Sequence, residues 1–165
     1  MLKVGLISDT HSWLDPEVFK YFADCDEIWH MGDIGSVQII EQLQEFKPLK
    51  AVFGNIDDAN IRHLLPEDLI FEAEGLKVLI THIGSLPPKY SGRIQKLLKI
   101  HSPDLFLCGH SHILRVIKDR EKFNLAYINP GAAGKHGFHH VRTIMRMTLE
   151  NQKITHLEAI ELGKR

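Results

Sequence analysis

Seven aspartate, asparagine and histidine residues follow short apolar runs of the chain: Asp9, His11, Asp33, Asn55, His82, His110 and His112. Their side chains offer carboxylate, amide and imidazole donors but no thiolate, a set that suits manganese, iron, zinc, nickel or magnesium. Seven donors are too many for one tetrahedral ion. They fit two divalent ions about 3.5–4 Å apart that share a bridging carboxylate.

The spacing of the paired donors supports a common centre. Asp9 and His11 are separated by one residue, and so are His110 and His112. In an extended segment, alternate side chains point to the same side. We therefore expect both members of each pair to reach the metals.

Five predicted strands place these donors at their carboxyl ends. The first three strands, 3–8, 27–31 and 49–53, alternate with a helix that begins near Asp15 and a helix over 36–46. This alternation predicts parallel strands joined by crossover helices, whose carboxyl ends share one edge of the sheet.

The remaining elements predict a second sheet. A helix is expected over 91–101, and strands are expected over 68–73, 76–81, 104–108, 113–118, 123–128, 141–149 and 154–161. The last two strands form a hairpin. No linker or repeat divides the chain, so residues 1–165 are expected to form a single domain of two packed sheets with helices outside.

Composition excludes several classes of function. The net charge of −1 offers no basic surface for nucleic acid, and no apolar run reaches the 18 residues of a membrane span. Cys25 and Cys108 are expected to be buried thiols in a reducing compartment. We therefore expect a cytoplasmic protein.

Together, the motifs resemble the calcineurin-like metallophosphoesterase superfamily, and the Gly54-Asn55-Ile56-Asp57 form resembles its compact prokaryotic phosphodiesterase branch. The resemblance implies an α/β fold of two packed mixed β-sheets, a double β-sandwich flanked by helices in four layers, α/β/β/α. It also implies two divalent ions, with manganese as the first choice. The implied activity is phosphodiester hydrolysis by in-line attack of hydroxide held between the ions.

The resemblance also assigns the ligands. One ion would take Asp9, His11, Asp33 and His112, and the other would take Asp33, Asn55, His82 and His110. Asp33 would bridge. His110 and His112 would thus face different ions, with Ser111 turned away between them.

One position departs from the family pattern. Many larger relatives carry a histidine after the motif asparagine, where it is thought to protonate the leaving group, and this chain has Ile56. We therefore expect a preference for leaving groups that depart with little protonation. Asp57, Asp58 and the cluster Lys135-His136-Gly137-Phe138-His139-His140 remain candidates for the acid.

Other polar residues have simpler interpretations. His30 is expected to support a ligand through a hydrogen bond, Cys108 to be a core thiol behind the metals, and Asn129-Pro130-Gly131 to be a tight turn near the site. His136, His139 and His140 are expected in a solvated loop.

Two alternative functions remain open. The first is a phosphomonoesterase or nucleotide hydrolase. The second is a non-catalytic scaffold, because the retromer complex contains a subunit of this fold that serves as an interaction platform. That subunit lacks the histidine of the Asp-x-His motif, whereas this chain keeps His11. The sequence leaves a homo-oligomer open and gives no interface signature.

Overall fold

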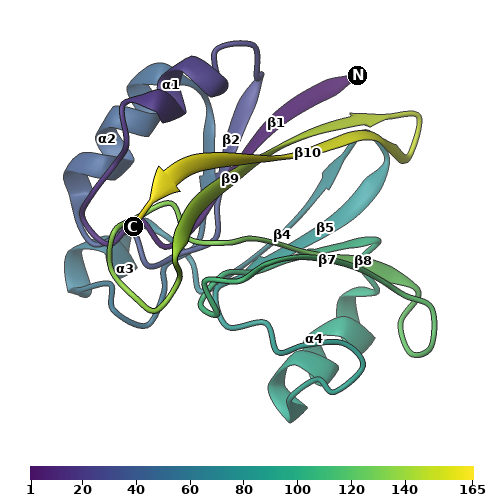
Figure 1. Ribbon diagram of the computed structural model, residues 1–165. Coiled ribbons are helices and arrows are strands. Elements are labelled where there is room, and N and C mark those ends of the chain that lie inside the picture. Colours follow the sequence, from purple (N-terminus) through teal and green to yellow (C-terminus); the bar gives the residue numbers. More distant parts are fainter.

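The computed structural model describes residues 1–165, which form ten strands and four helices (Figure 1). One sheet contains β1 (Leu2–Ile7), β2 (Glu27–His30), β3 (Leu49–Ala51), β9 (Val141–Glu150) and β10 (Lys153–Lys164), in the order β10-β9-β1-β2-β3. The other contains β4 (Asp68–Ala73), β5 (Leu76–Thr81), β6 (Leu105–Leu107), β7 (Leu114–Asp119) and β8 (Leu125–Pro130), in the order β4-β5-β6-β8-β7.

Each sheet contains three neighbouring parallel strands, which lie at one end of the first sheet and in the middle of the second. Strands β1, β2 and β3 run parallel in the first sheet, as do β5, β6 and β8 in the second. The other strand pairs, including the β9–β10 hairpin, are antiparallel. Both sheets are therefore mixed, and each presents the carboxyl ends of its parallel strands at one edge.

The helices cover the outer faces of the two sheets (Figure 1). Helices α1 (Glu17–Tyr21), α2 (Val37–Phe46) and α3 (Ala59–Leu64) lie beside the first sheet, and α4 (Gly92–His101) lies against the second. None of the four helices is both long and apolar enough to cross a membrane.

Three apolar clusters hold these layers together. The largest lies between the sheets and includes Leu6, Trp29, Ile80 and Leu107. A second joins α1, α2 and α3 to the first sheet, and a third joins α4 to the second sheet. Burial of apolar area, at about 25 cal/mol per Å², is the main stabilising force in each layer. The predicted α/β/β/α architecture is confirmed.

The structure also differs from the sequence prediction. Helix α3 was not expected; it begins after Asp58, whose Oδ1 accepts a hydrogen bond from Ile61 N at 3.1 Å and caps the helix. Asn129 and Pro130 end strand β8, so the predicted tight turn is wrong at these two residues, and Gly131 makes the turn with φ 76°.

Candidate metal centre

The seven candidate ligands lie in loops at the carboxyl ends of β1, β2, β3, β5 and β6. The backbone there is left-handed at Asp9, His11, Asp33, His110 and His112, with φ between 46° and 66°. The expected extended backbone is therefore wrong, although the side chains of each pair do converge. Such φ values are uncommon outside glycine and concentrate at functional sites.

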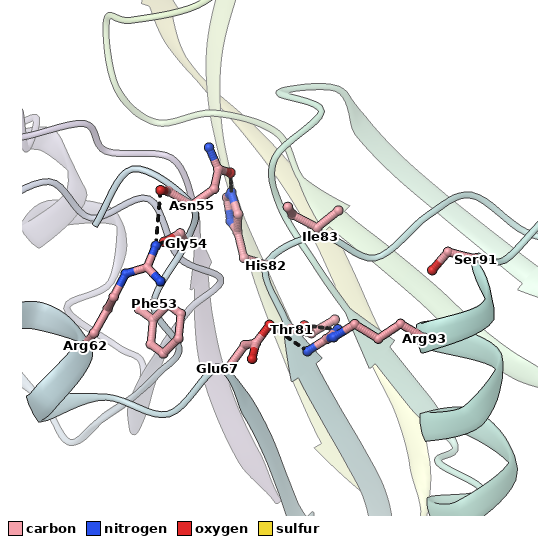
Figure 2. Close-up of a pocket in the computed structure, with 10 residues that line it drawn as sticks. All are labelled: Phe53, Gly54, Asn55, Arg62, Glu67, Thr81, His82, Ile83, Ser91 and Arg93. Atoms are coloured by element: carbon pink, nitrogen blue, oxygen red, sulfur yellow. Dashed lines mark hydrogen bonds and ion pairs between the residues drawn. The ribbon is translucent and has the colours of Figure 1, made fainter. Parts of the chain in front are cut away.

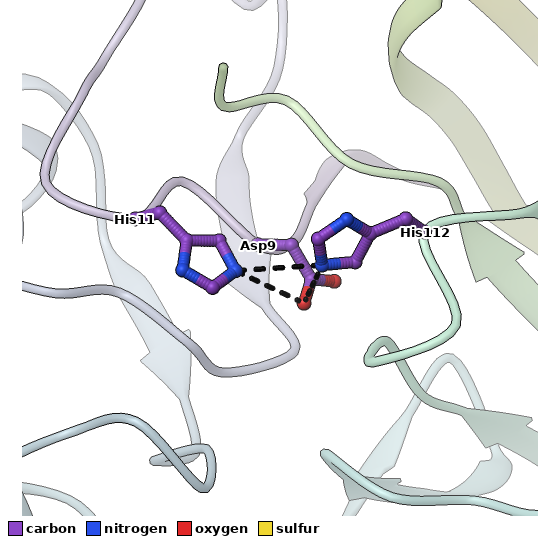
Figure 3. Close-up of side chains that lie close together, drawn as sticks. All are labelled: Asp9, His11 and His112. Atoms are coloured by element: carbon purple, nitrogen blue, oxygen red, sulfur yellow. Dashed lines mark hydrogen bonds and ion pairs between the residues drawn. The ribbon is translucent and has the colours of Figure 1, made fainter. Parts of the chain in front are cut away.

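One group of donors comprises Asp9, His11 and His112 (Figure 3). Asp9 Oδ1 lies 3.1 Å from His112 Nε2 and 3.9 Å from His11 Nε2. The two imidazole Nε2 atoms are 3.4 Å apart. Three donor atoms thus point at one shared position.

The second group comprises Asp33, His82 and His110, whose donor atoms lie within 4.8 Å of one another. His82 Nε2 is 3.2 Å from Asp33 Oδ1 and 3.1 Å from Asn55 Oδ1. The rings of His82 and His110 are 5.2 Å apart. Asn55 therefore joins this group through its amide oxygen.

Asp33 lies between the two groups. Its Oδ1 faces His82, while its Oδ2 lies 3.6 Å from His11 Nε2. One carboxylate thus directs an oxygen to each group, which is the placement that a bridging ligand needs. His110 and His112 lie in different groups, as the family resemblance implies.

An unsatisfied buried oxygen shows that these residues suit a cation. Asp9 is fully buried, and its Oδ2 accepts hydrogen bonds from Ser8 Oγ at 2.6 Å and His110 N at 3.1 Å. Its Oδ1 is buried without any hydrogen-bond partner, the one such side-chain atom in the protein. A buried carboxylate oxygen without a partner is unfavourable. A divalent cation among these donors would satisfy it.

Burial and the neighbouring charges shift the pKa values of the donors and so determine their protonation. Burial raises the pKa of Asp33, but the hydrogen bond and charge of His82, the hydrogen bond from Ile56 N and the charge of His11 together outweigh this effect, so the pKa lies below its usual value. Burial lowers the pKa of His11 and favours the neutral ring that can bind a metal. Burial also opposes protonation of His82, but the Asp33 and Asp9 carboxylates raise its pKa overall. Protons and cations therefore compete for His82.

Hydrogen bonds determine which ring nitrogen of His82, and which ring nitrogen of His112, is free to face the metal centre. His82 Nδ1 is 2.7 Å from Met31 O, and a carbonyl can only accept, so Nδ1 carries the proton and Nε2 is free. His139 Nε2 likewise donates to Gly134 O at 2.9 Å, which leaves its Nδ1 to accept from His112 Nδ1 at 3.1 Å. His112 Nε2 is thereby free to face the centre.

Two further residues support the ligand loops through contacts that no local pattern in the sequence indicates. Asn129 Nδ2 donates to Gly109 O at 2.8 Å and to Ser111 Oγ at 3.1 Å, which holds the loop that carries His110 and His112. The Asp57 carboxylate accepts backbone hydrogen bonds from Ile34, Gly35 and Gly54. It therefore ties the loops after β2 and β3 together.

Two glycines allow the ligand loops to pack closely. A Cβ on Gly54 would lie 2.0 Å from Asp33 Oδ1 and 2.3 Å from Asp33 N. A Cβ on Gly109 would lie 2.0 Å from Ser8 Oγ and 2.7 Å from Asp9 Oδ2. Any side chain at either position would displace a donor or the group that holds it.

Cys108 is a core thiol as expected, whereas His30 makes no hydrogen bond to a candidate ligand and instead contacts neighbouring residues of the ligand loops. His30 is fully buried and neutral, because burial lowers its pKa to about 3. Its Nδ1 accepts from Gly32 N and its Nε2 contacts Thr10 Oγ1, both at 3.1 Å. Cys108 is a buried core thiol that contacts Tyr127 Oη.

The expectation of a solvated loop is wrong for His139, which contacts His112, and incomplete for His136, whose exposed ring lies 4.9 Å from that of His11. Phe138 between them is 99% exposed. This loop therefore borders the candidate metal centre.

Comparisons with known proteins agree with this geometry. The calcineurin-like phosphoesterase superfamily domain matches residues 2–152. A probable metallophosphoesterase from Methanothermobacter thermautotrophicus is 31% identical over 138 residues, which cover 78% of this chain and 76% of the relative.

Solved structures share the fold at low identity. A protein described as a novel archaeal phosphodiesterase has a TM-score of 0.75 and 21% identity, over 98% of this chain and 100% of that one. Vps29 from Entamoeba histolytica, solved with zinc, has a TM-score of 0.73 and 16% identity, over 98% and 99% of the two chains. The matched domain spans all seven donor positions, and the chain belongs to the calcineurin-like phosphoesterase superfamily.

Proposed function

We propose that the protein is a phosphodiesterase that depends on two divalent metal ions. The supporting observation is the convergence of two donor groups around Asp33, beside a buried Asp9 oxygen that lacks a partner. One ion would be held by Asp9, His11, Asp33 and His112, and the other by Asp33, Asn55, His82 and His110. Two such ions acidify a water molecule and offset negative charge on a phosphoryl group.

None of the residues that directly follow Asn55 can readily protonate the leaving group of a diester. Ile56, beside Asn55, is 46% exposed and cannot donate a proton. Asp57 is 3% exposed and its carboxylate is occupied by three backbone N–H groups, while Asp58 caps α3. Neither aspartate is free to protonate a leaving group. This favours diesters with good leaving groups.

The dependence of rate on leaving-group pKa tests this point. For a series of aryl phosphodiesters, we expect the rate to fall steeply as the leaving-group pKa rises, because no side chain shares its proton. A flat dependence would show that an acid operates, and His136 would then be the first residue to substitute.

The physiological metal, the cellular location and the size of the substrate are also proposed here. We propose manganese as the physiological metal, with nickel, iron, zinc and magnesium as alternatives, because imidazole and carboxylate donors accept all of them. The two cysteines are buried and unpaired, which supports a cytoplasmic location. The substrate would be a small phosphodiester.

Metal reconstitution provides the direct test. Chelator-treated protein would receive manganese, nickel or magnesium, and a chromogenic diester and monoester would be assayed in parallel. We expect metal-dependent diester hydrolysis that is largely lost in Asn55→Ala and His82→Ala and retained in His63→Ala, which alters an exposed histidine of α3. Faster monoester hydrolysis would favour the phosphomonoesterase alternative. Folded protein that hydrolyses neither ester with any metal would favour the scaffold.

A further inference from the structure

A cavity of about 290 Å³ lies beside the second donor group, between the loop after β5 and the loop after β6. It is lined by Ile83, Gly84, Ser85, Leu86, Gly109, His110, Ser111, Ile113, Arg115 and Tyr127. A cavity of roughly 150 Å³ can hold benzene, so this one has room for a substituted ring. Because His110 forms part of its wall, its occupant would lie next to the metal centre.

The walls of this cavity are largely apolar and open to solvent. Ile83 is 48% exposed, Leu86 41% and Ile113 53%. Ile83 directly follows the candidate ligand His82, and Ile113 directly follows His112. An apolar group on the substrate would remove this area from water while its phosphorus lies at the metals.

Arg115 gives the cavity a charge without a partner. The guanidinium of this half-buried arginine makes no hydrogen bond or ion pair with any protein group, whereas the arginines of the neighbouring cavity are engaged (Figure 2). There, Arg93 Nη2 lies 2.7 Å from Asp68 and 3.0 Å from Glu67, and Arg62 Nε donates to Asp57 O at 2.7 Å. Among the three arginines of these two cavities, Arg115 is the one whose guanidinium is free to bind an anion.

The register of the sheet explains the position of Arg115. In β7 it pairs with Asn129, which holds the loop of His110 and His112. Alternate residues of a strand share a face. Ile117 and Asp119, on the face of Arg115, contact the α4 cluster and Tyr90 Oη respectively. Arg115 therefore lies on the α4 side of the sheet, below the ligand loop.

We propose that this cavity binds one ester group of the substrate, a ring-sized apolar group that carries an anionic substituent. The apolar walls would bind the ring, and Arg115 would bind a carboxylate or phosphate at its far end. This inference rests on the proposed function and narrows its substrate class. The preferred substrate is a phosphodiester with a second negative charge on one arm.

Matched substrates test the proposal. Three diesters would share a 4-nitrophenyl leaving group and carry phenyl, 4-carboxyphenyl or 4-phosphonophenyl as the other arm. For the wild-type manganese enzyme, we expect kcat/KM to be about tenfold higher for at least one charged arm than for phenyl, the effect of one charge-assisted hydrogen bond. The two charged arms separate carboxylate from phosphate recognition. Arg115→Gln should reduce this ratio to about one. Arg120→Gln, at an exposed site, should keep it.

A binding measurement separates this proposal from the proposed function. Calorimetry would measure the affinity of non-hydrolysable phosphonates with the same arms for the metal-loaded wild type and Arg115→Gln. Loss of the charged-arm preference in Arg115→Gln supports the subsite, even if no diester is hydrolysed and the phosphodiesterase proposal fails. Equal binding of charged and uncharged arms by the wild type, or an unchanged preference in Arg115→Gln, overturns the subsite whether or not the enzyme is active.

Discussion

The substitution Gly54→Ala should disable the metal centre although it replaces none of the candidate ligands. The added Cβ would lie 2.0 Å from Asp33 Oδ1 and 2.3 Å from Asp33 N, whereas ordinary contacts begin at 3.4 Å. Backbone atoms occupy the nearby space, so the Asp33 carboxylate must move by more than an ångström. Oδ1 would then leave both Ile56 N and His82 Nε2, to which it now lies at 3.1 Å and 3.2 Å.

The effect on function should be large. Disturbing the support of a metal ligand lowers metal affinity or activity by about 10- to 100-fold, and a misplacement of about 1 Å can reduce a rate by about 100-fold. We therefore expect kcat/KM for a diester to fall about 100-fold at saturating manganese, with fewer bound ions per chain. Elemental analysis and steady-state kinetics would measure both quantities, and circular dichroism would confirm folding.

Gly92→Ala is the matched control for this substitution. No atom lies within 4 Å of a Cβ added at Gly92, which is the first residue of α4. We expect unchanged activity, and stability equal to wild type or up to about 1 kcal/mol higher. A Gly54→Ala protein with wild-type rate and metal content would refute the idea that close packing holds Asp33 in place.

Three further predictions concern groups around the centre. Burial lowers the pKa of His30 from 6.5 to about 3, so the unfolded chain binds a proton first as pH falls below 6.5. In metal-free protein this should remove about 1.4 kcal/mol of unfolding free energy per pH unit between pH 6 and 4, and urea titrations should show a shallower loss in His30→Gln. His139→Ala should weaken manganese binding about 10- to 100-fold by calorimetry, because His112 loses the acceptor that fixes its tautomer; unchanged affinity would contradict that role. Asp58→Ala should lose about 1 kcal/mol of stability on thermal denaturation with its helix cap, and a changed pH–rate profile would contradict our exclusion of Asp58 as the acid.

The sequence predicted most of the fold because its signals are local and periodic. Apolar runs identified the strands, and the rule that parallel strands share an edge placed Asp9, Asp33 and Asn55 together. Helix α3 has only six residues, too few for a clear periodicity, and its signal was the capping Asp58. The left-handed backbone at the ligands has no periodic signature. Asp and His tolerate it more readily than most residues, which was the available clue.

The supporting residues could not be predicted because their contacts are distant in sequence. His139 is 27 positions from His112, in a loop whose composition resembles a solvated segment. Asp57 and Asn129 likewise act on backbone groups of other loops. These contacts depend on how the loops after separate strands pack, which no local pattern encodes.

The most direct test of the account counts the metal ions and the turnover in the same sample. Chelator-treated protein would be titrated with manganese, and bound metal per chain would be measured beside the rate of diester hydrolysis. We predict that activity appears as the second ion binds, at two ions per chain. Full activity with one ion per chain, or two bound ions without hydrolysis of any phosphoester, would contradict the proposed two-metal phosphodiesterase.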